Sequence, residues 1–374
     1  MFCKSLTLIN FRNISEETVT FTNGTNVLLG MNAQGKTNLL EAICFFALGK
    51  SFKPIKDKDA IMFDKEEANL SMIFEDSIRE QKLDMRISRI RKKCIFQNGL
   101  LIPRTSELIG IFRAVLFCPE HLSLVQDGPS CRRDFLDMAI SQIRPVYLSS
   151  LIRYQHILKE RNRLIKDVED REDGKKIFDD TVGLWSAQLA KEAARIAKMR
   201  LKYTKIVSEN VALCFQDMTG SAEKPDLHYV GSAHLEEDEY EDEEKVEKAY
   251  LKLFNENHEK EIRAGATLWG IHKDDIEIRL NGKEARFYAS QGQQRSLALA
   301  MKMAEGEICR KDCGEYPVFL FDDVLSELDS KRREYLIREM KEKQVIMTTC
   351  EDLSEQDAHI IHVNQGHFFE NNPV

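Results

Sequence analysis

The chain has 374 residues, of which 43% are hydrophobic and 31% charged, a composition that supports a sizeable core and about two domains and excludes a disordered or fibrous protein. Its apolar stretches, such as 43–48 and 318–321, are far shorter than the roughly 18 residues of a membrane span. The nine cysteines form no CxxC pair and no secretory signal is visible. We therefore expect a cytoplasmic protein without a membrane partner or a zinc site.

The charge is unevenly distributed along the chain. A formal net charge of -8 argues by itself against a nucleic-acid partner. However, eight of the nine residues at 236–244 are acidic, and the rest of the chain is neutral without them. We interpret this run as a solvated loop or helix face, with an interaction tail as the alternative. Basic residues gather in three other places, at 50–58, 86–93 and 132–133.

The predicted elements, in chain order, indicate an insertion. Short apolar or alternating runs between residues 6 and 29 predict strands, and residues 38–48 predict a helix. Alternation at 70–74 and 83–87 is typical of half-buried antiparallel strands. From about 132 to 258 apolar residues recur at three- and four-residue spacing, which predicts a short helical arm rather than a long coiled coil. Strand-like patterns return after residue 262, so we predict an α/β protein with an arm at 131–261 between segments 1–130 and 262–374.

The strongest motif is a phosphate-binding loop directly after a predicted strand and before a predicted helix. It matches G-x-x-x-x-G-K-[ST] with Gly30, Met31, Asn32, Ala33, Gln34, Gly35, Lys36 and Thr37. The glycines let the backbone curl so that N–H groups and the helix N-terminus converge on phosphate oxygens. We expect Lys36 to lie near the β- and γ-phosphates of ATP and the Thr37 hydroxyl to bind Mg²⁺.

An acidic pair completes the predicted site. Asp322 and Asp323 follow the apolar run 318–321, which predicts a buried parallel strand. Asp322 would orient Mg²⁺ through its water shell, and Asp323 would accept a proton from the attacking water. Alone this pair is weak support, but together with the loop it is strong.

A second anion-binding turn precedes a predicted helix. Ser290, Gly292 and Gln293 belong to a Ser-x-Gly-Gln turn, although an ordinary helix N-cap at Ser290 is the alternative. One chain does not need two γ-phosphate sites. We therefore predict that this turn of one protomer closes on the ATP held by another, with the segment from Ser326 to Asp329 facing the same interface. The order of loop, turn, acidic strand and Ser-x-Leu-Asp defines the ABC-type ATPase heads.

These parts and further markers, including Asn10-Phe11-Arg12 and 322–329, make the sequence resemble the RecF family, bacterial DNA replication and repair proteins related to the SMC heads. The resemblance implies that Arg12 is a phosphate contact and that Glu120 stands at the metal-sensing position of the Q-loop. It also implies that Ser290 and Gly292 contact the γ-phosphate of the ATP held by the other protomer, and that Asp329 is the D-loop aspartate. The implied partners are double-stranded DNA and single-stranded junctions or gaps, the mediators RecO and RecR, and RecA, which is loaded at gaps in support of the SOS response.

The sequence departs from the family pattern at two places. Lys273 replaces an arginine after His272, and lysine does not reproduce a bidentate fork. Cys350 stands where ABC heads place the switch histidine. His272 is a candidate substitute, but a structural role for it is the alternative.

We therefore predict a weak DNA-dependent ATPase that forms an ATP-dependent homodimer. Asp323 is one methylene shorter than the usual glutamate, so hydrolysis should be slow, and slow turnover suits a clamp. A transporter-energising ABC subunit, a P-loop kinase or GTPase, and a nonhydrolysing scaffold are the alternatives.

Overall fold

The structure is a computed structural model that describes residues 1–170, 173–350 and 358–370. The chain divides into two compact units. The head unit comprises residues 1–123, 213–222 and 291–374, and the arm unit comprises 124–212 and 223–290. Within the described ranges, no helix combines the length and the apolarity needed to cross a membrane.

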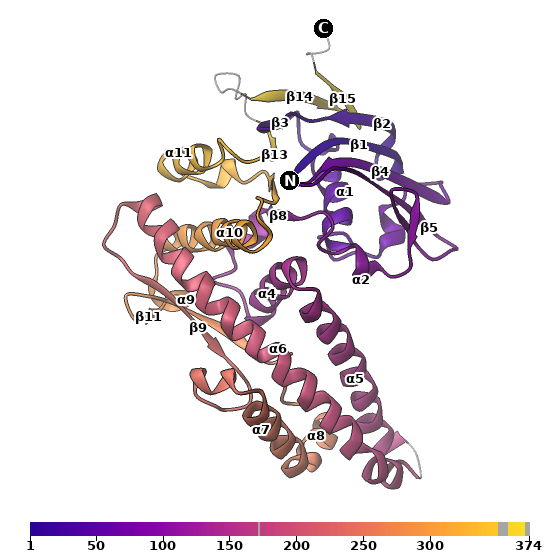
Figure 1. Ribbon diagram of the computed structural model, residues 1–374, viewed down its shortest axis with the longest axis vertical. Coiled ribbons are helices and arrows are strands. Elements are labelled where there is room, and N and C mark those ends of the chain that lie inside the picture. Colours follow the sequence, from indigo (N-terminus) through magenta and orange to yellow (C-terminus); the bar gives the residue numbers. More distant parts are fainter. Residues whose placement is uncertain (171–172, 351–357, 371–374) are drawn as a thin grey trace. The chain divides into compact units, whose positions relative to one another are not determined.

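The head unit contains an antiparallel sheet of order β2-β1-β4-β5-β6-β7, part of which is labelled in Figure 1. Its strands are β1 (Phe2–Phe11), β2 (Ile14–Thr20), β4 (Glu67–Glu75), β5 (Glu80–Ser88), β6 (Cys94–Gln97) and β7 (Leu100–Ile102). In β4 and β5 buried residues alternate with more exposed ones, as the sequence predicts for strands with one face on a core.

A second sheet in the head unit has the order β15-β14-β3-β13-β12-β8. Its strands are β3 (Thr25–Leu29), β8 (Ala114–Phe117), β12 (Val318–Asp322), β13 (Val345–Thr349), β14 (His359–Asn364) and β15 (His367–Phe369). All pairs except β14–β15 are parallel. The apolar run at 318–321 is thus the buried parallel strand that the sequence predicts, and the carboxyl ends of β3, β13, β12 and β8 share one edge.

Helix α1 (Lys36–Leu48) packs against strands of both sheets, including β1, β4, β12 and β13, and almost all of it is buried. Its apolar residues pack with residues of both sheets in one core, so the two sheets together hold the helix in place. The other helices of the head unit are η1 (Asp57–Ala60), α2 (Thr105–Leu108), α3 (Pro119–Leu122), α10 (Gln291–Cys313), η3 (Leu325–Glu327) and α11 (Ser330–Glu339).

The arm unit is mostly helical. Its helices are α4 (Pro129–Ile143), α5 (Pro145–Asp170), α6 (Gly174–Thr219), η2 (Glu237–Glu241), α7 (Glu243–Glu256), α8 (His258–Ala264) and α9 (Ala285–Tyr288). A small sheet of order β11-β10-β9 is formed by β9 (Pro225–Val230), β10 (Asp275–Leu280) and β11 (Lys283–Glu284). A fully buried ion pair of 2.6 Å between Arg161 and Glu261 joins α5 to α8.

The structure draws the boundaries of the units differently from the predicted segments 131–261 and 262–374. Residues 262–290 belong to the arm unit because β10 pairs with β9. The last turns of α6 belong to the head unit, where Asp217 forms an ion pair of 2.7 Å with Arg338. The acidic run is a short helical turn and the start of α7, and Lys205 pairs with Asp238 and Glu241 at 2.8 Å each.

Candidate nucleotide site

The phosphate loop is shaped by its two glycines. It joins the end of β3 to the start of α1. Gly35 has a φ of +116°, and a Cβ there would lie 3.0 Å from Asn13 Oδ1. At Gly30 a Cβ would lie 2.3 Å from the carbonyl oxygen of Val363. Any larger side chain at Gly30 would therefore push the loop away from β14, and at Gly35 it would also strain the backbone.

Contacts with Gln34 hold the loop from outside. The Gln34 carbonyl oxygen accepts hydrogen bonds from Asn13 Nδ2 (3.2 Å) and from the N–H of Gly366 (2.8 Å). Its side-chain oxygen accepts one from the N–H of Gln365 at 2.6 Å. The turn between β14 and β15 thus fixes the loop, a function that no local signal around residues 365–366 reveals. Met31, Asn32 and Ala33, at the tip, are exposed.

Lys36 lies folded over the loop. Its Nζ donates to the carbonyl oxygens of Met31 (2.9 Å) and Gly30 and lies 3.3 Å from Cys350 Sγ. No side chain caps the first turn of α1, so its N–H groups are available to an anion. A triphosphate would exchange the carbonyl contacts of Lys36 for contacts with its oxygens.

Two hydroxyl groups converge on Asp322. Thr37 Oγ1 donates to Asp322 Oδ1 at 2.7 Å, and Thr348 Oγ1 donates to the same oxygen at 2.9 Å. Burial raises the pKa of Asp322, while these two hydrogen bonds act in the opposite direction. Hydroxyl and carboxylate oxygens are ligands that Mg²⁺ accepts, so Thr37 and Asp322 fit a magnesium ion directly or through water.

Asp323 follows in a left-handed backbone conformation, with a φ of 52°. Its N–H donates to Thr348 Oγ1 at 2.8 Å, and its carbonyl oxygen accepts from Ser326 Oγ at 2.8 Å. Among the described residues, nothing forms a hydrogen bond or ion pair with its carboxylate. The strained backbone, held by Thr348, thus leaves a carboxylate available beside Asp322.

Arg12 is bound to protein groups. Its Nε and Nη2 donate to the two carboxylate oxygens of the buried Glu41 at 3.0 and 2.7 Å, and its Nη1 donates to the Asp59 carbonyl oxygen at 2.9 Å. Ser51 Oγ donates to Glu41 at 2.5 Å, and Lys53 Nζ lies 3.6 Å from it. A phosphate contact by Arg12 therefore stays a prediction. The structure shows that Glu41 holds the Arg12 side chain in place.

Glu120 lies at the same sheet edge as the acidic pair. It is exposed in α3, which follows β8. Strand β8 runs parallel to β12, with Phe117 opposite Phe321. The carboxyl ends of the two strands are therefore aligned, which is consistent with the metal-sensing position predicted for Glu120.

The predicted signature turn and the D-loop are joined by Arg332, a residue that the sequence does not single out. Arg332 Nη2 donates to the Gly292 carbonyl oxygen (2.6 Å), and its Nε donates to Ser296 Oγ (2.7 Å). The carboxylate of Asp329 accepts the N–H of Arg332 at 3.0 Å and pairs with its guanidinium. Ser290 directly precedes α10, as an N-cap would, and Gln293 lies in its first turn.

Cys350, at the position of the switch histidine, and His272, its candidate substitute, lie in different units. Cys350 directly follows β13 and lies 3.0 Å from Asn32 Oδ1 as well as close to Lys36. His272 belongs to the arm unit, where Tyr154 Oη lies 2.6 Å from its Nδ1 and the Thr267 carbonyl oxygen 3.1 Å from its Nε2. Burial lowers the pKa of His272 to about 4. Both ring nitrogens are occupied, which favours the structural interpretation.

Comparisons with known proteins find relatives over nearly the whole chain. The model of the RecF/RecN/SMC N terminal domain family matches residues 2–367. The chain is 36% identical over 371 residues to a DNA replication and repair protein RecF of Clostridium beijerinckii, covering 98% of each chain. The solved structure described as the recombination mediator protein RecF-ATPrS in the RecFOR pathway superposes with a TM-score of 0.92 at 31% identity, covering 98% of this chain and 97% of that one. The corresponding RecF-ATP structure gives a TM-score of 0.91. The transporter alternative is therefore excluded.

Proposed function

The chain belongs to the RecF family of DNA replication and repair proteins, and we propose that it is a clamp that binds ATP and Mg²⁺ between two copies of itself, closes on DNA and hydrolyses ATP slowly to open again. RecO and RecR are its mediators, and loading of RecA at single-stranded gaps, with support of the SOS response, is the outcome.

The observation that carries the proposal is the convergence of Lys36, Thr37 and Asp322 at the uncapped N-terminus of α1. The three groups come from the phosphate loop and from β12, far apart in the sequence, and Thr37 and Asp322 lie within hydrogen-bond distance. A cation, a hydroxyl group and a carboxylate are what the phosphates and the metal ion of Mg²⁺-ATP require.

Asp323 is the hydrolytic base in this proposal. Its carboxylate is available and follows Asp322 directly. An aspartate is shorter than the glutamate of most ABC heads, and Cys350 does not act as an imidazole would. Misplacement of a base by about 1 Å costs orders of magnitude in rate, so turnover is slow and the ATP-bound state is long-lived.

Closure depends on the second copy. Ser290, Gly292 and Gln293 of one protomer contact the γ-phosphate held by the other, and Asp329 faces the same interface. To move the closed pair from rare to dominant, ATP must favour it by roughly 5 kcal/mol. Arg332 supports this arrangement because it ties Gly292 to Asp329.

Two variants test the clamp. Lys36→Ala should lose ATP binding, whereas Asp323→Asn should keep ATP and accumulate dimers in sedimentation experiments with saturating ATP and Mg²⁺, with and without gapped duplex DNA. An Asp323→Asn protein that binds ATP but stays monomeric would refute the clamp.

Two further measurements separate the remaining classes. Ser290→Arg should abolish turnover in the clamp, whereas a P-loop kinase or GTPase would keep it. Single-turnover assays in which the wild-type protein binds ATP without ever cleaving it would instead indicate a nonhydrolysing scaffold.

A further inference from the structure

The three basic stretches of the sequence differ in the contacts that their side chains make. In the arm unit, Arg132 is almost fully buried and forms a bidentate ion pair with Asp275 at 2.7 and 2.8 Å. Arg133 donates to the carbonyl oxygen of Asp274 at 2.9 Å. Both arginines hold α4 to the segment that leads into β10, so this stretch has a structural role within the arm unit.

The other two stretches form one surface in the head unit. Lys93 Nζ forms an ion pair of 2.6 Å with Asp57 and also donates to the Gly49 carbonyl oxygen. Arg89 Nε donates to the carbonyl oxygen of Lys65 at 2.8 Å. These two side chains join residues 49–66 to residues 86–93, which are separate in the sequence. We call the combined surface the basic patch.

The basic patch has a large excess of positive charge in a chain whose net charge is negative. Its two segments contain ten basic and four acidic residues, a net charge of +6. The side chains of six cations of the patch form neither an ion pair nor a hydrogen bond with any described residue, and all six are exposed: Lys50, Lys56, Lys58, Lys65, Arg91 and Lys92. Without a partner, this concentration of like charge is repulsive. A polyanion would relieve that repulsion.

We propose that the basic patch binds the phosphate backbone of duplex DNA. This assignment rests on the proposed function and adds the surface through which it acts. Single-strand sites use several aromatic side chains for base stacking, whereas Phe63 is the one strongly exposed aromatic residue of the patch. Six free cations without such a stacking platform suit a backbone contact that reads no sequence.

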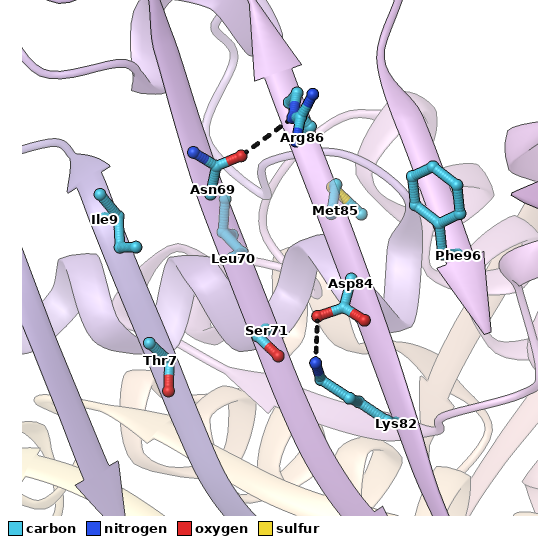
Figure 2. A pocket seen from close by; sticks show the side chains of 10 residues that line it. All are labelled: Thr7, Ile9, Asn69, Leu70, Ser71, Lys82, Asp84, Met85, Arg86 and Phe96. Atoms are coloured by element: carbon cyan, nitrogen blue, oxygen red, sulfur yellow. Dashed lines mark hydrogen bonds and ion pairs between the residues drawn. The ribbon is translucent and has the colours of Figure 1, made fainter. Parts of the chain in front are cut away.

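The hollow on the outer face of the antiparallel sheet is the competing location in the head unit. It has a volume of about 510 Å³. Figure 2 shows that its charged side chains are directed at neighbours in the same sheet: Lys82 pairs with Asp84 at 3.0 Å, and Arg86 donates to Asn69 at 3.2 Å. The hollow shares Arg86 with the patch. Because the cations of the hollow are already partnered and Asp84 adds a negative charge, the hollow suits phosphate less well than the six free cations of the patch.

The test replaces four free cations of the patch by glutamine in one protein: Lys56, Lys58, Arg91 and Lys92. The matched control replaces four exposed lysines of α6 and α7, Lys191, Lys202, Lys248 and Lys252, by glutamine, with the same change in net charge. Fluorescence anisotropy measures binding of labelled duplex and of labelled single strand, with ATP and Mg²⁺, across a salt series.

We expect the patch variant to lose at least about tenfold in duplex affinity at 0.1 M salt. The slope of log affinity against log salt should become shallower by about three to four, since each phosphate contact contributes roughly 0.9. The control should keep both quantities, and thermal melting should show that both variants are folded. Sedimentation with ATP should show that both still dimerise.

The other outcomes overturn one claim or the other. If the wild-type protein binds duplex and the patch variant binds it equally well, or if only the arm control loses affinity, the assignment of the patch is wrong and the clamp stands. A patch variant that loses only single-strand binding also overturns the duplex assignment. If even the wild-type protein binds no DNA with ATP present, the proposed function itself fails. If the patch variant keeps DNA binding but loses an acidic protein partner, the patch is a protein interface and the assignment is wrong.

Discussion

Thr348 should be essential to the geometry of the site, because it contacts both acidic residues. Its hydroxyl donates to Asp322 Oδ1 at 2.9 Å and accepts the N–H of Asp323 at 2.8 Å. Thr348→Val keeps the shape of the side chain but removes both hydrogen bonds. The variant therefore tests whether one buried hydroxyl positions both acidic residues.

The expected cost follows from those two contacts. A hydrogen bond to a charged group contributes about 1.5–3 kcal/mol, and a donor left without a partner costs about 1–3 kcal/mol. The N–H of Asp323 lies at a partly exposed residue, so water recovers part of its loss, and the added methyl group of valine returns about 0.8 kcal/mol. We expect a net destabilisation of about 2–3 kcal/mol, which corresponds to a roughly 30- to 150-fold change in the local opening equilibrium.

Urea unfolding followed by circular dichroism measures the global effect, and amide hydrogen exchange of a peptide spanning 318–324 measures the local one. Thr348→Ser is the control, because it keeps the hydroxyl and loses only a methyl group. Thr348→Val should also bind Mg²⁺-ATP more weakly than Thr348→Ser. If the two variants unfold at the same urea concentration and protect this peptide equally, the assignment of Thr348 as the positioning residue is wrong.

Three further variants or conditions have defined outcomes. Glu41→Gln should destabilise the head unit by about 1–3 kcal/mol in urea unfolding, less than a fully buried pair because Arg12 and Lys53 are partly exposed; an unchanged midpoint would contradict it. Because burial raises the pKa of Asp322, a proton competes with Mg²⁺ at higher pH than at an ordinary aspartate. As the pH is lowered, Mg²⁺-ATP affinity should thus begin to fall at a higher pH than at a site with an ordinary aspartate, and should fall more than affinity for metal-free ATP; parallel titration curves would argue against this. Arg332→Lys keeps the charge but loses the forked guanidinium that donates to Gly292 and Ser296. It should weaken ATP-dependent dimerisation at least about tenfold in sedimentation, while ATP binding by the monomer is unchanged. Equal loss of both would indicate misfolding.

The parts of the site that could be predicted from the sequence are those in which local chemistry determines local structure. The loop from Gly30 to Thr37 contains its own turn residues, its cation and its helix start, and the strand 318–322 is apolar without interruption. Each is recognisable within eight residues. The sequence also predicts that the loop and the acidic end of this strand lie close together, because a phosphate-bound metal ion requires an acidic ligand.

The parts that could not be predicted depend on long-range contacts between ordinary residues. Gln34 is held by residues 365–366, and Thr348 meets Asp322 only because β13 pairs with β12. Arg332 resembles any other arginine of a charged helix until α10 is placed beside it. The boundary of the arm unit differs from the predicted one for the same reason, since only the pairing of β10 with β9 places 262–290 in that unit.

Glu41 connects the two surfaces that the proposals assign to ATP and to DNA. It lies on α1, the helix whose N-terminus receives the phosphates, and it is fully buried. Its carboxylate binds Arg12, the residue that follows β1, and it binds Ser51 and Lys53 of residues 49–66. A buried carboxylate needs these partners to offset its desolvation. A movement of the basic patch therefore either moves α1 as well or breaks these bonds. Because α1 begins in the phosphate loop, DNA bound on the patch has a direct physical connection to that loop.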